Sequence, residues 1–306
     1  MTDFPWTRRR LLIAGSGAIA LATGLAARAG RATTTGSRSF EELERSAGGR
    51  LGVAALDTGS GHTISHRGDE RFGFCSTFKL LLAAIVLREA DRGTLKLDAL
   101  VHFSAADMVP YAPVTEQHLA RGYMTIGALA EAAQVTSDNV AANLLLGVIG
   151  GPAGFTARLR DAGDETTRLD RLEPALNFVP PGELQDTTTP MAMSRTAARF
   201  LATDYLSAAS RETLVDWMVA TRTGTRRLRA GLPVDWRAGD KTGTGRAEGM
   251  ADKYNDVAIV FPPGRAPVVV SAFYESPVRS TTTRAEDDAV LAEVGRIVAA
   301  GLSKST

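Results

Sequence analysis

The 306-residue chain contains a single cysteine, Cys75, so it has no partner with which to form an internal disulfide. Its four histidines show neither the H-E-x-x-H spacing of zinc hydrolases nor a comparable ligand pattern: His62, His66, His102 and His118. We therefore expect no metal centre. Cys75 directly precedes a serine, and we expect it to be a small buried thiol rather than a nucleophile, because free cysteine is often part of the core.

The chain also has no large excess of positive or negative charge. The chain has 35 Lys and Arg against 34 Asp and Glu, a net charge of +1. Residues 1–29 hold four arginines and one aspartate, so the rest carries 31 basic and 33 acidic residues, a net charge of −2. Proteins that bind nucleic acid usually show a basic patch or stripe. We therefore expect no nucleic-acid partner.

Residues 1–29 have the pattern of an export signal. Arg8-Arg9-Arg10 precedes an apolar run from Leu11 to Ala27, and Ala27-Arg28-Ala29 offers a small-residue cleavage site. The arginines and the Gly/Ala-rich apolar run favour the twin-arginine route. An uncleaved membrane anchor is the alternative, but the run is short for a span. We expect an exported protein, periplasmic or secreted, with no stable membrane span after cleavage.

The order of predicted elements indicates an α/β (α+β) fold. Strand-like patterns occur near both ends of the chain, and helical patterns fill the middle. We expect strands at 50–57, 62–66, 236–244, 257–261 and 268–274. We expect helices at 40–47, 78–90, 126–134, 139–149, 151–162, 189–203, 210–220 and 284–302. This order predicts a discontinuous α/β domain from residues 30–69 and 220–306, with an all-helical domain, 70–219, inserted between them.

The motif Ser76-Thr77-Phe78-Lys79 places a serine and a lysine three residues apart at the start of the apolar helix, hence on one helical face. A serine hydroxyl is a poor nucleophile unless a base takes its proton, and a lysine with a lowered pKa can do so. Such a motif arises by chance about once in a chain of this length. Here it falls at a helix N-terminus, where free N–H groups can bind an oxyanion.

Two further short motifs are individually weak. Ser137-Asp138-Asn139 opens a predicted helix, and taken alone it is better interpreted as a helix cap, with Asp138 holding the turn. Lys241-Thr242-Gly243-Thr244 lies on a predicted strand. There a cation and two hydroxyls suit an anionic ligand, and Gly243 leaves room for it along the strand edge.

The run Arg168-Leu169-Asp170-Arg171-Leu172-Glu173-Pro174-Ala175-Leu176-Asn177 is the most specific signal. By composition alone it would be a solvated loop with alternating charges. It closely matches the Ω-loop of class A serine β-lactamases, here about residues 168–186. With the three other motifs in this order, nearly all of the chain after residue 29 resembles that family, whose signature includes S-x-x-K, S-D-N and K-T-G.

The resemblance implies a two-lobed fold, in which an antiparallel sheet is flanked by helices and carries an inserted all-helical domain. It implies hydrolysis of penicillins and cephalosporins through a serine acyl-enzyme, and hence antibiotic resistance. The expected partners are small β-lactam substrates, with no cofactor, and we expect a monomer. The catalytic residues would be Ser76, Lys79, Ser137 and Glu173. Either Lys79 or Glu173 acting through water would be the acylation base, which is disputed for the family.

The resemblance also assigns supporting roles. Backbone N–H groups of Ser76 and Thr244 would form the oxyanion hole. Arg171 and Asp186 would tie the ends of the Ω-loop together. The remaining substrate-site residues, including Asn177 as a ligand of the hydrolytic water, would be Asn139, Asn177, Lys241, Thr242, Gly243, Thr244, Tyr111 and Arg227. For Arg227, which Asp288 would face, a solvated arginine-rich turn is an equally weighted alternative.

Two rival functions share most of these motifs. A penicillin-binding D,D-peptidase would be acylated and stay acylated, because it lacks Glu173. A non-catalytic, cell-wall-associated binding protein would keep the site without turnover, although four intact motifs argue against it. The chain departs from the family pattern between Gly245 and Asn255, where the hairpin is several residues longer than usual. We expect this loop to alter selectivity for cephalosporins.

Overall fold

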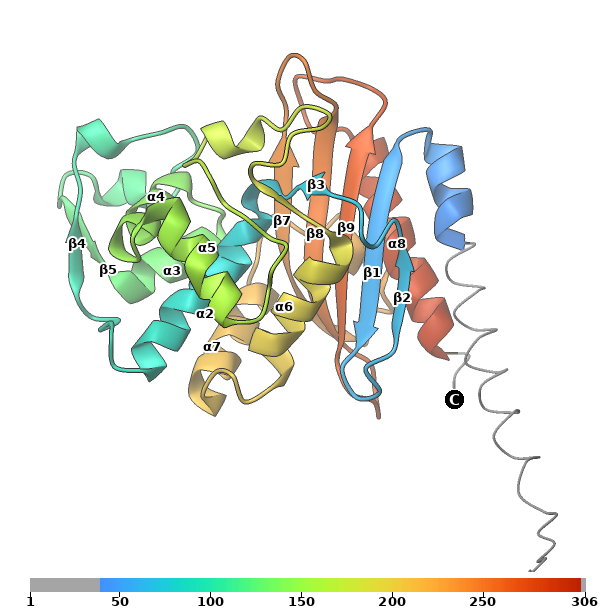
Figure 1. Ribbon diagram of the computed structural model, residues 1–306, viewed down its shortest axis with the longest axis horizontal. Coiled ribbons are helices and arrows are strands. Elements are labelled where there is room, and N and C mark those ends of the chain that lie inside the picture. The colour runs from blue at the N-terminus through green and yellow to red at the C-terminus, as the bar shows by residue number, and fades with distance from the viewer. Residues whose placement is uncertain (1–38, 304–306) are drawn as a thin grey trace, which may run out of the picture.

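A five-stranded antiparallel sheet organises the computed structural model, which describes residues 39–303 (Figure 1). Its strand order is β2-β1-β9-β8-β7, so strands from both ends of the chain lie side by side. The strands are β1 (Arg50–Asp57), β2 (Thr63–His66), β7 (Arg237–Gly245), β8 (Asp252–Phe261) and β9 (Val268–Ser276). The α/β (α+β) fold predicted from the sequence is confirmed.

The central strands bury side chains on both faces. Along β8, Val257 and Ile259 belong to one apolar cluster, whereas Ala258 and Val260 belong to another. Alternate residues of a strand point to opposite faces, so the two clusters are the two sides of the sheet. Such strands are rich in β-branched residues without a polar face, which is the pattern in the sequence of β8 and β9.

Helices cover both faces (Figure 1). The helix at 39–47 and α8 (Ala285–Ser303) lie on one side, and α8 packs on β8 and β9. On the other side, α6 (Pro190–Ala202) packs on β1 and β9, and α7 (Ala208–Val219) packs on β7. The other helices are α2 (Phe78–Asp91), α3 (Ile126–Val135), α4 (Asn139–Val148) and α5 (Gly151–Asp161). The predicted domain boundaries stay a prediction.

The helix α2 is the core of the helical layer. It contacts α3, α4, α5, α6 and α7, and it is apolar on nearly all sides. A helix with this pattern belongs in a protein interior, where each large side chain contributes about 1.5–3 kcal/mol. Lys79 in its first turn is fully buried nonetheless. A buried lysine is expensive unless its surroundings compensate it, which marks this turn as special.

The shortest elements and the first residues of one strand were not predicted from the sequence. Two short pairs join β3 (Phe72–Gly73) to β6 (Thr187–Thr188), and β4 (Leu100–His102) to β5 (Tyr123–Thr125). The strand expected at 257–261 begins at Asp252. Its first five residues include the buried polar side chains Lys253, Asn255 and Asp256, which interrupt the apolar pattern. Five 3₁₀ helices complete the described chain: η1 (Cys75–Thr77), η2 (Ala105–Asp107), η3 (Thr115–His118), η4 (Ala175–Asn177) and η5 (Leu228–Gly231).

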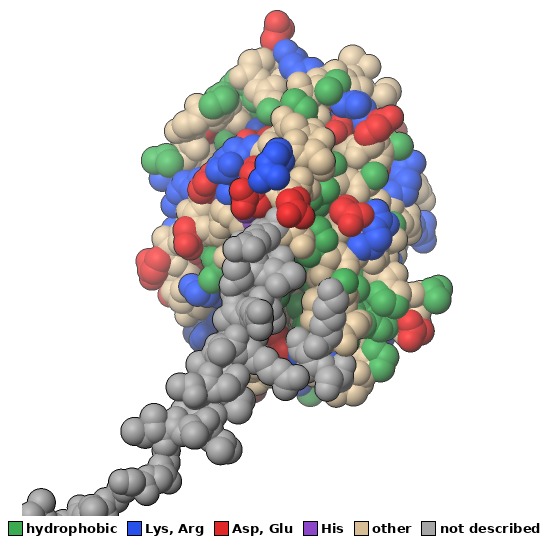
Figure 2. All heavy atoms as spheres, turned by 90° about the vertical axis from the view of Figure 1, so that its right-hand side faces the viewer, with side chains coloured by type: hydrophobic (Ala, Val, Ile, Leu, Met, Phe, Trp, Pro, Cys, Tyr) green, Lys and Arg blue, Asp and Glu red, His purple; other side chains and the backbone are tan. Residues whose placement is uncertain are grey.

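The surface beside the helix at 39–47 carries both signs of charge. Figure 2 shows acidic and basic side chains interspersed on this face. Arg67 pairs with Glu44 and Glu70, and Glu70 also pairs with Arg50. The predicted export signal lies outside the described residues. Within 39–303, no single helix has the length and apolar character to cross a membrane, although α4 and α5 together, bent by 73°, pass on length and composition.

Close packing of α8 on η5 provides the first prediction. A Cβ at Gly295 would lie 2.3 Å from the backbone oxygen of Leu228, so Gly295→Ala must push α8 away from η5. We expect the free energy of unfolding, measured by urea denaturation, to fall by about 1–3 kcal/mol. Gly301→Ala in the same helix is the matched control, because a Cβ there meets nothing within 4 Å. Equal stability of the two variants would contradict the packing argument.

Candidate active site

Four separate segments of the chain bring the predicted residues to one place. Ser76 lies in η1, and Lys79 lies in the first turn of α2 that follows it. Ser137 immediately precedes the N-cap of α4, and Lys241 lies on β7. Glu173 lies on the Ω-loop, just before η4. The contacts below connect all five side chains, so the four sequence motifs form a single site.

The hydroxyl of Ser76 contacts two groups that can take its proton. Its Oγ accepts a hydrogen bond from Lys79 Nζ at 2.9 Å and donates one to Glu173 Oε1 at 3.1 Å. Lys79 Nζ and Glu173 Oε1 are themselves an ion pair at 2.9 Å. Ser76 is partly exposed, whereas the other two side chains are fully buried. The geometry is that of an activated nucleophile whose hydroxyl faces solvent.

Burial changes the acid–base character of Lys79. Its ammonium also donates to the Ser137 carbonyl at 3.0 Å and to Asn139 Oδ1. Removal from water disfavours the charged form and lowers the pKa of Lys79 below its ordinary value, while the Glu173 carboxylate opposes this effect. A lysine shifted in this direction can act as a base as well as a proton donor.

A second buried lysine holds the hydroxyl of Ser137. Lys241 Nζ donates to Ser137 Oγ at 3.0 Å and to the Thr242 carbonyl at 2.8 Å. Burial, and next the charge of Lys79, lower the pKa of Lys241 well below its usual value. Asp138 accepts the N–H groups of Ala141 and Val114, each at 2.9 Å. The prediction that Asp138 holds the turn is therefore confirmed.

Asn143 fixes the backbone on which Glu173 stands. Its side-chain amide accepts the Glu173 N–H and donates to the Glu173 carbonyl, each at 2.9 Å. Asn177 Nδ2 donates to Glu173 Oε2 at 2.6 Å. Sequence analysis missed Asn143. The signal was an asparagine inside the apolar helix α4, four residues after Asn139 and hence on the same face.

The expected tie across the Ω-loop is present. Arg171 Nε pairs with Asp186 Oδ2 at 2.5 Å, and Asp186 Oδ1 accepts the N–H groups of Asp170 and Arg171. Arg171 also donates to the Phe178 carbonyl at 2.9 Å. Burial nevertheless raises the pKa of Asp186 above its ordinary value. The carboxylate of Asp186 thus holds together the first and last parts of the loop that carries Glu173.

Gly243 lets β7 run directly against the nucleophile turn. A Cβ at this position would lie 2.7 Å from the Phe74 carbonyl oxygen and 3.1 Å from the Ser76 nitrogen. The structure thus adds a packing reason to the space for a ligand that the sequence suggested. Thr242 and Thr244 flank this contact, and Thr242 Oγ1 shares a 2.6 Å hydrogen bond with Thr223 Oγ1.

Arg227 is buried behind the strand, so the solvated-turn alternative is wrong for this residue. Its Nε donates to Asp288 Oδ1 at 2.8 Å, which confirms the expected partner. Its Nη2 donates to Thr244 Oγ1 at 2.7 Å. Tyr111 differs: its side chain is 57% exposed, although its carbonyl accepts the Asn139 N–H at 2.9 Å and so lies beside the site.

Unusual backbone conformations gather around this site. Within the described residues, five non-glycine residues have positive φ, and four of them lie in or beside site elements: Cys75, Tyr111, Ser137 and Asp186. The fifth is Arg67. Such conformations cost of order 1–3 kcal/mol and persist only where the surroundings impose them. Their clustering is independent support for a functional site here.

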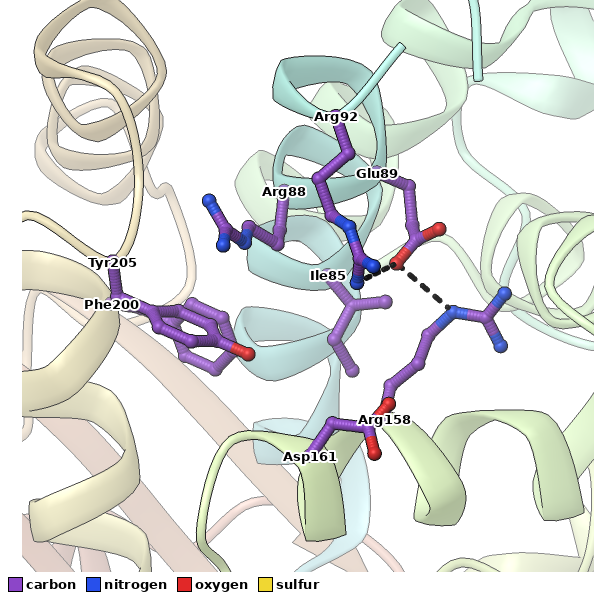
Figure 3. A pocket seen from close by; sticks show the side chains of 8 residues that line it. All are labelled: Ile85, Arg88, Glu89, Arg92, Arg158, Asp161, Phe200 and Tyr205. Carbon is purple, nitrogen blue, oxygen red and sulfur yellow. Dashed lines mark ion pairs between the residues drawn. The ribbon is translucent and has the colours of Figure 1, made fainter. Parts of the chain in front are cut away.

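A small charged cavity at the opposite end of α2 is separate from this site (Figure 3). Its volume is about 10 Å³, room for roughly one water molecule. Glu89 lies between Arg158 and Arg92, at 3.4 and 4.0 Å. No group of three or more His, Cys, Asp or Glu suited to a metal ion occurs within 39–303.

Comparisons with known proteins agree with this geometry. Residues 37–302 match the model of the beta-lactamase enzyme family. The chain is 46% identical to beta-lactamase AST-1 of Nocardia asteroides, over 95% of this chain and 94% of the relative. It is 43% identical to the carbapenem-hydrolyzing beta-lactamase KPC of Klebsiella oxytoca, over 86% of this chain and 87% of the relative.

Solved structures give the same result. An ancestral (GNCA) class A beta-lactamase superposes with a TM-score of 0.81 at 55% identity, covering 86% of this chain and 98% of that chain. A beta lactamase from Xanthomonas campestris superposes with a TM-score of 0.82 at 46% identity, covering 89% of this chain and 98% of that chain.

The position of Cys75 leads to a prediction about its reactivity. The thiol is fully buried, and burial raises its pKa to about 12, so it stays protonated and shielded at neutral pH. We expect no reaction of the native protein with Ellman's reagent at pH 8, and one thiol per chain after unfolding in guanidinium. Rapid labelling of the native protein would contradict the burial of Cys75.

Buried carboxylates behind β7 predict a pH dependence of stability. Burial raises the pKa of Asp240 to about 6, although Arg229 pairs with it at 3.0 Å. The folded state therefore binds the Asp240 proton more tightly than the unfolded state does, for which the ordinary value is 3.8. The resulting stabilisation is present below that value and is lost as pH rises through about 6.

We therefore expect the stability difference between wild type and Asp240→Asn, from urea denaturation, to shift in favour of wild type when pH falls from 7 to 4. Asp235→Asn, at an exposed position, is the control and should show no such trend. A wild-type advantage that is the same at both pH values would contradict a raised Asp240 pKa.

Proposed function

The chain belongs to the class A serine β-lactamases, which hydrolyse the β-lactam ring and so confer antibiotic resistance, and we propose that Ser76 carries this reaction through an acyl-enzyme. The contact of Ser76 Oγ with both Lys79 Nζ and Glu173 Oε1 is the observation that supports this assignment. The nucleophile thereby has a proton acceptor for the first step, and the site has a carboxylate for the second.

Acylation begins with attack of Ser76 Oγ on the lactam carbonyl. Its proton passes to Lys79 or to Glu173, directly or through water; both groups lie within hydrogen-bond distance. The carbonyl oxygen becomes an oxyanion, which the backbone N–H groups of Ser76 and Thr244 would stabilise. Each donor of this kind is worth roughly 10²–10³-fold in rate in other hydrolases.

Ring opening requires a proton for the lactam nitrogen. Ser137 Oγ is suited to deliver it, because Lys241 Nζ lies 3.0 Å away and Lys79 contacts the Ser137 carbonyl. As the C–N bond breaks, the hydroxyl proton of Ser137 goes to the nitrogen. An adjacent ammonium then restores the Ser137 proton. Two lysines with lowered pKa values make this transfer less costly than ordinary lysines would.

Deacylation uses the carboxylate of Glu173. We assign it the proton of a water molecule that attacks the acyl carbonyl, with Asn177 as the second group around that water. Asn177 Nδ2 orients Glu173 at 2.6 Å, and its Oδ1 is buried without a hydrogen-bond partner within residues 39–303, so it can receive a hydrogen bond from water. The bond between the acyl carbon and the Ser76 oxygen then breaks, the proton that Glu173 took from water passes to that oxygen, and the site is regenerated.

Cations behind β7 suit the carboxylate that β-lactams carry. Lys241 and Arg227 are both buried beside this strand, and Arg227 donates to Thr244 Oγ1. We propose that Thr242 and Thr244 contact the substrate carboxylate and that Gly243 leaves the strand edge open to it. Asn139 would contact the substrate side-chain amide, and the exposed ring of Tyr111 would border the entrance.

We further propose that the protein is exported by the twin-arginine route and acts in the periplasm or as a secreted protein. We propose that it acts as a monomer. The support for export is the sequence of residues 1–29, with its arginines, apolar run and Ala27-Arg28-Ala29 site. Penicillins and cephalosporins are the substrates we propose on the basis of family membership.

The decisive test compares wild type with Glu173→Ala. We expect wild-type residues 30–306 to turn over benzylpenicillin and a chromogenic cephalosporin. The variant should acylate and stall, because it retains Lys79 beside Ser76 but lacks the deacylation base. Intact-protein mass spectrometry detects the adduct. Glu165→Ala is the control, since that side chain is 80% exposed.

Two results would change the assignment. A Glu173→Ala variant without an adduct would make Glu173 necessary for acylation and remove Lys79 as a sufficient base. A wild-type protein that acylates once and stops would instead indicate a penicillin-binding D,D-peptidase.

A further inference from the structure

One side chain of the loop between β7 and β8 is buried against the Ω-loop. The β7–β8 loop, residues 246–251, turns at Gly249, and the next residue, Met250, is only 4% exposed. At the start of the loop, Arg246 donates to Thr283. Met250 is the one large apolar side chain in this loop, and its burial is more than a purely solvated loop would need.

Met250 contacts the Ω-loop two residues after Asn177. Its Sδ accepts the Val179 N–H at 3.4 Å, a weak hydrogen bond between a backbone donor and a thioether. Its methyl group lies beside Gly245, where a Cβ would be 3.5 Å from Met250 Cε and 3.1 Å from the Asn177 carbonyl oxygen. The Met250 side chain therefore packs between the end of β7 and the part of the Ω-loop that holds Asn177.

Lys253 also lies beside the Met250 side chain. It is 1% exposed, its Nζ lies 3.9 Å from Met250 Sδ, and it pairs with Glu275 at 3.6 Å. A Cβ at Gly73 would lie 2.8 Å from Lys253 Cε and 2.9 Å from Val179 Cβ. The lysine stem and the valine thus pack together over β3. A buried ammonium with one distant ion pair gains from a polarisable sulfur beside it.

We propose that Met250 is a positioning residue for deacylation: its buried side chain packs against the Ω-loop at Val179 and so fixes Asn177 and Glu173 for the hydrolytic water. Among the described contacts, Met250 has none with Ser76, Lys79 or Ser137, which lie on η1, on α2 and just before the N-cap of α4. Loosening Met250 should therefore leave acylation intact. The proposal rests on the proposed function, because it assumes that Glu173 serves the second step and that Lys79, which contacts Ser76 Oγ at 2.9 Å, is a sufficient base for the first.

The test separates the two steps by stopped-flow kinetics with a chromogenic cephalosporin. For Met250→Ala we expect the deacylation rate constant to fall about tenfold or more, since small misplacements of catalytic groups are costly. The acylation rate constant should stay within about twofold of wild type, so that kcat and KM fall together. The acyl adduct should accumulate in intact-protein mass spectra.

Two further variants distinguish positioning from general destabilisation. Met250→Leu keeps the volume but removes the sulfur acceptor, and we expect it to restore most of the lost deacylation rate, because packing supplies most of the fastening. Met193→Ala makes a comparable deletion at a fully buried site on α6, the helix that packs on β1 and β9. It should lower the melting temperature without slowing deacylation.

The outcomes are distinct from those of the Glu173 experiment. If wild type turns over and Met250→Ala deacylates at the wild-type rate, the inference about Met250 fails while the proposed function stands. Equal slowing by Met193→Ala would also overturn it, because the effect would then be global. A wild type that never deacylates would refute the proposed function itself.

Discussion

The contact between Lys79 and Glu173 is the constraint on which the rest of the site depends. Two opposite charges lie 2.9 Å apart, and both side chains are fully buried. Removing each from water costs several kcal/mol, which only good geometry and further hydrogen bonds recover. The lysine belongs to a core helix, but the carboxylate arrives on a loop. The surrounding structure therefore has to hold that loop as firmly as a helix would be held.

Several independent contacts meet this requirement. Asn143 binds both backbone groups of Glu173, and Asn177 orients its carboxylate. Asp186 closes the loop from its far end through Arg171. Asn143 reaches the Ω-loop from α4, whereas the other contacts lie within the loop, so the carboxylate is fixed by several modest interactions rather than one strong one. Net hydrogen-bond contributions of about 1 kcal/mol each become sufficient only in such numbers.

Further buried charges compensate one another around the substrate strand. Lys241 lies on β7, and Arg227 is buried beside this strand. Asp288 pairs with Arg227, while Asp240 on β7 and Asp256 on β8 are buried near Lys241. Burial raises the pKa of Asp240 and of Asp256 despite their cationic neighbours, and at Asp256 the charge of Asp240 adds to the effect of burial.

From the residues alone, the sequence predicted contacts that depend on short spacing. The distant pair of Arg227 with Asp288 was expected only from the resemblance, and other distant contacts were missed. Ser76 with Lys79, or Glu173 with Asn177, can be recognised because a helix or a short loop brings residues three or four apart together. Asn143 and Met250 act on residues 30 and 71 positions away, so no local pattern marks them. The same division separates the chemical steps. Acylation depends on a core helix and a central strand, whereas deacylation depends on a loop and its supports. A D,D-peptidase shares the residues for acylation and lacks the carboxylate base of the loop. The contacts around Glu173 therefore determine whether the acyl-enzyme is hydrolysed or stays acylated.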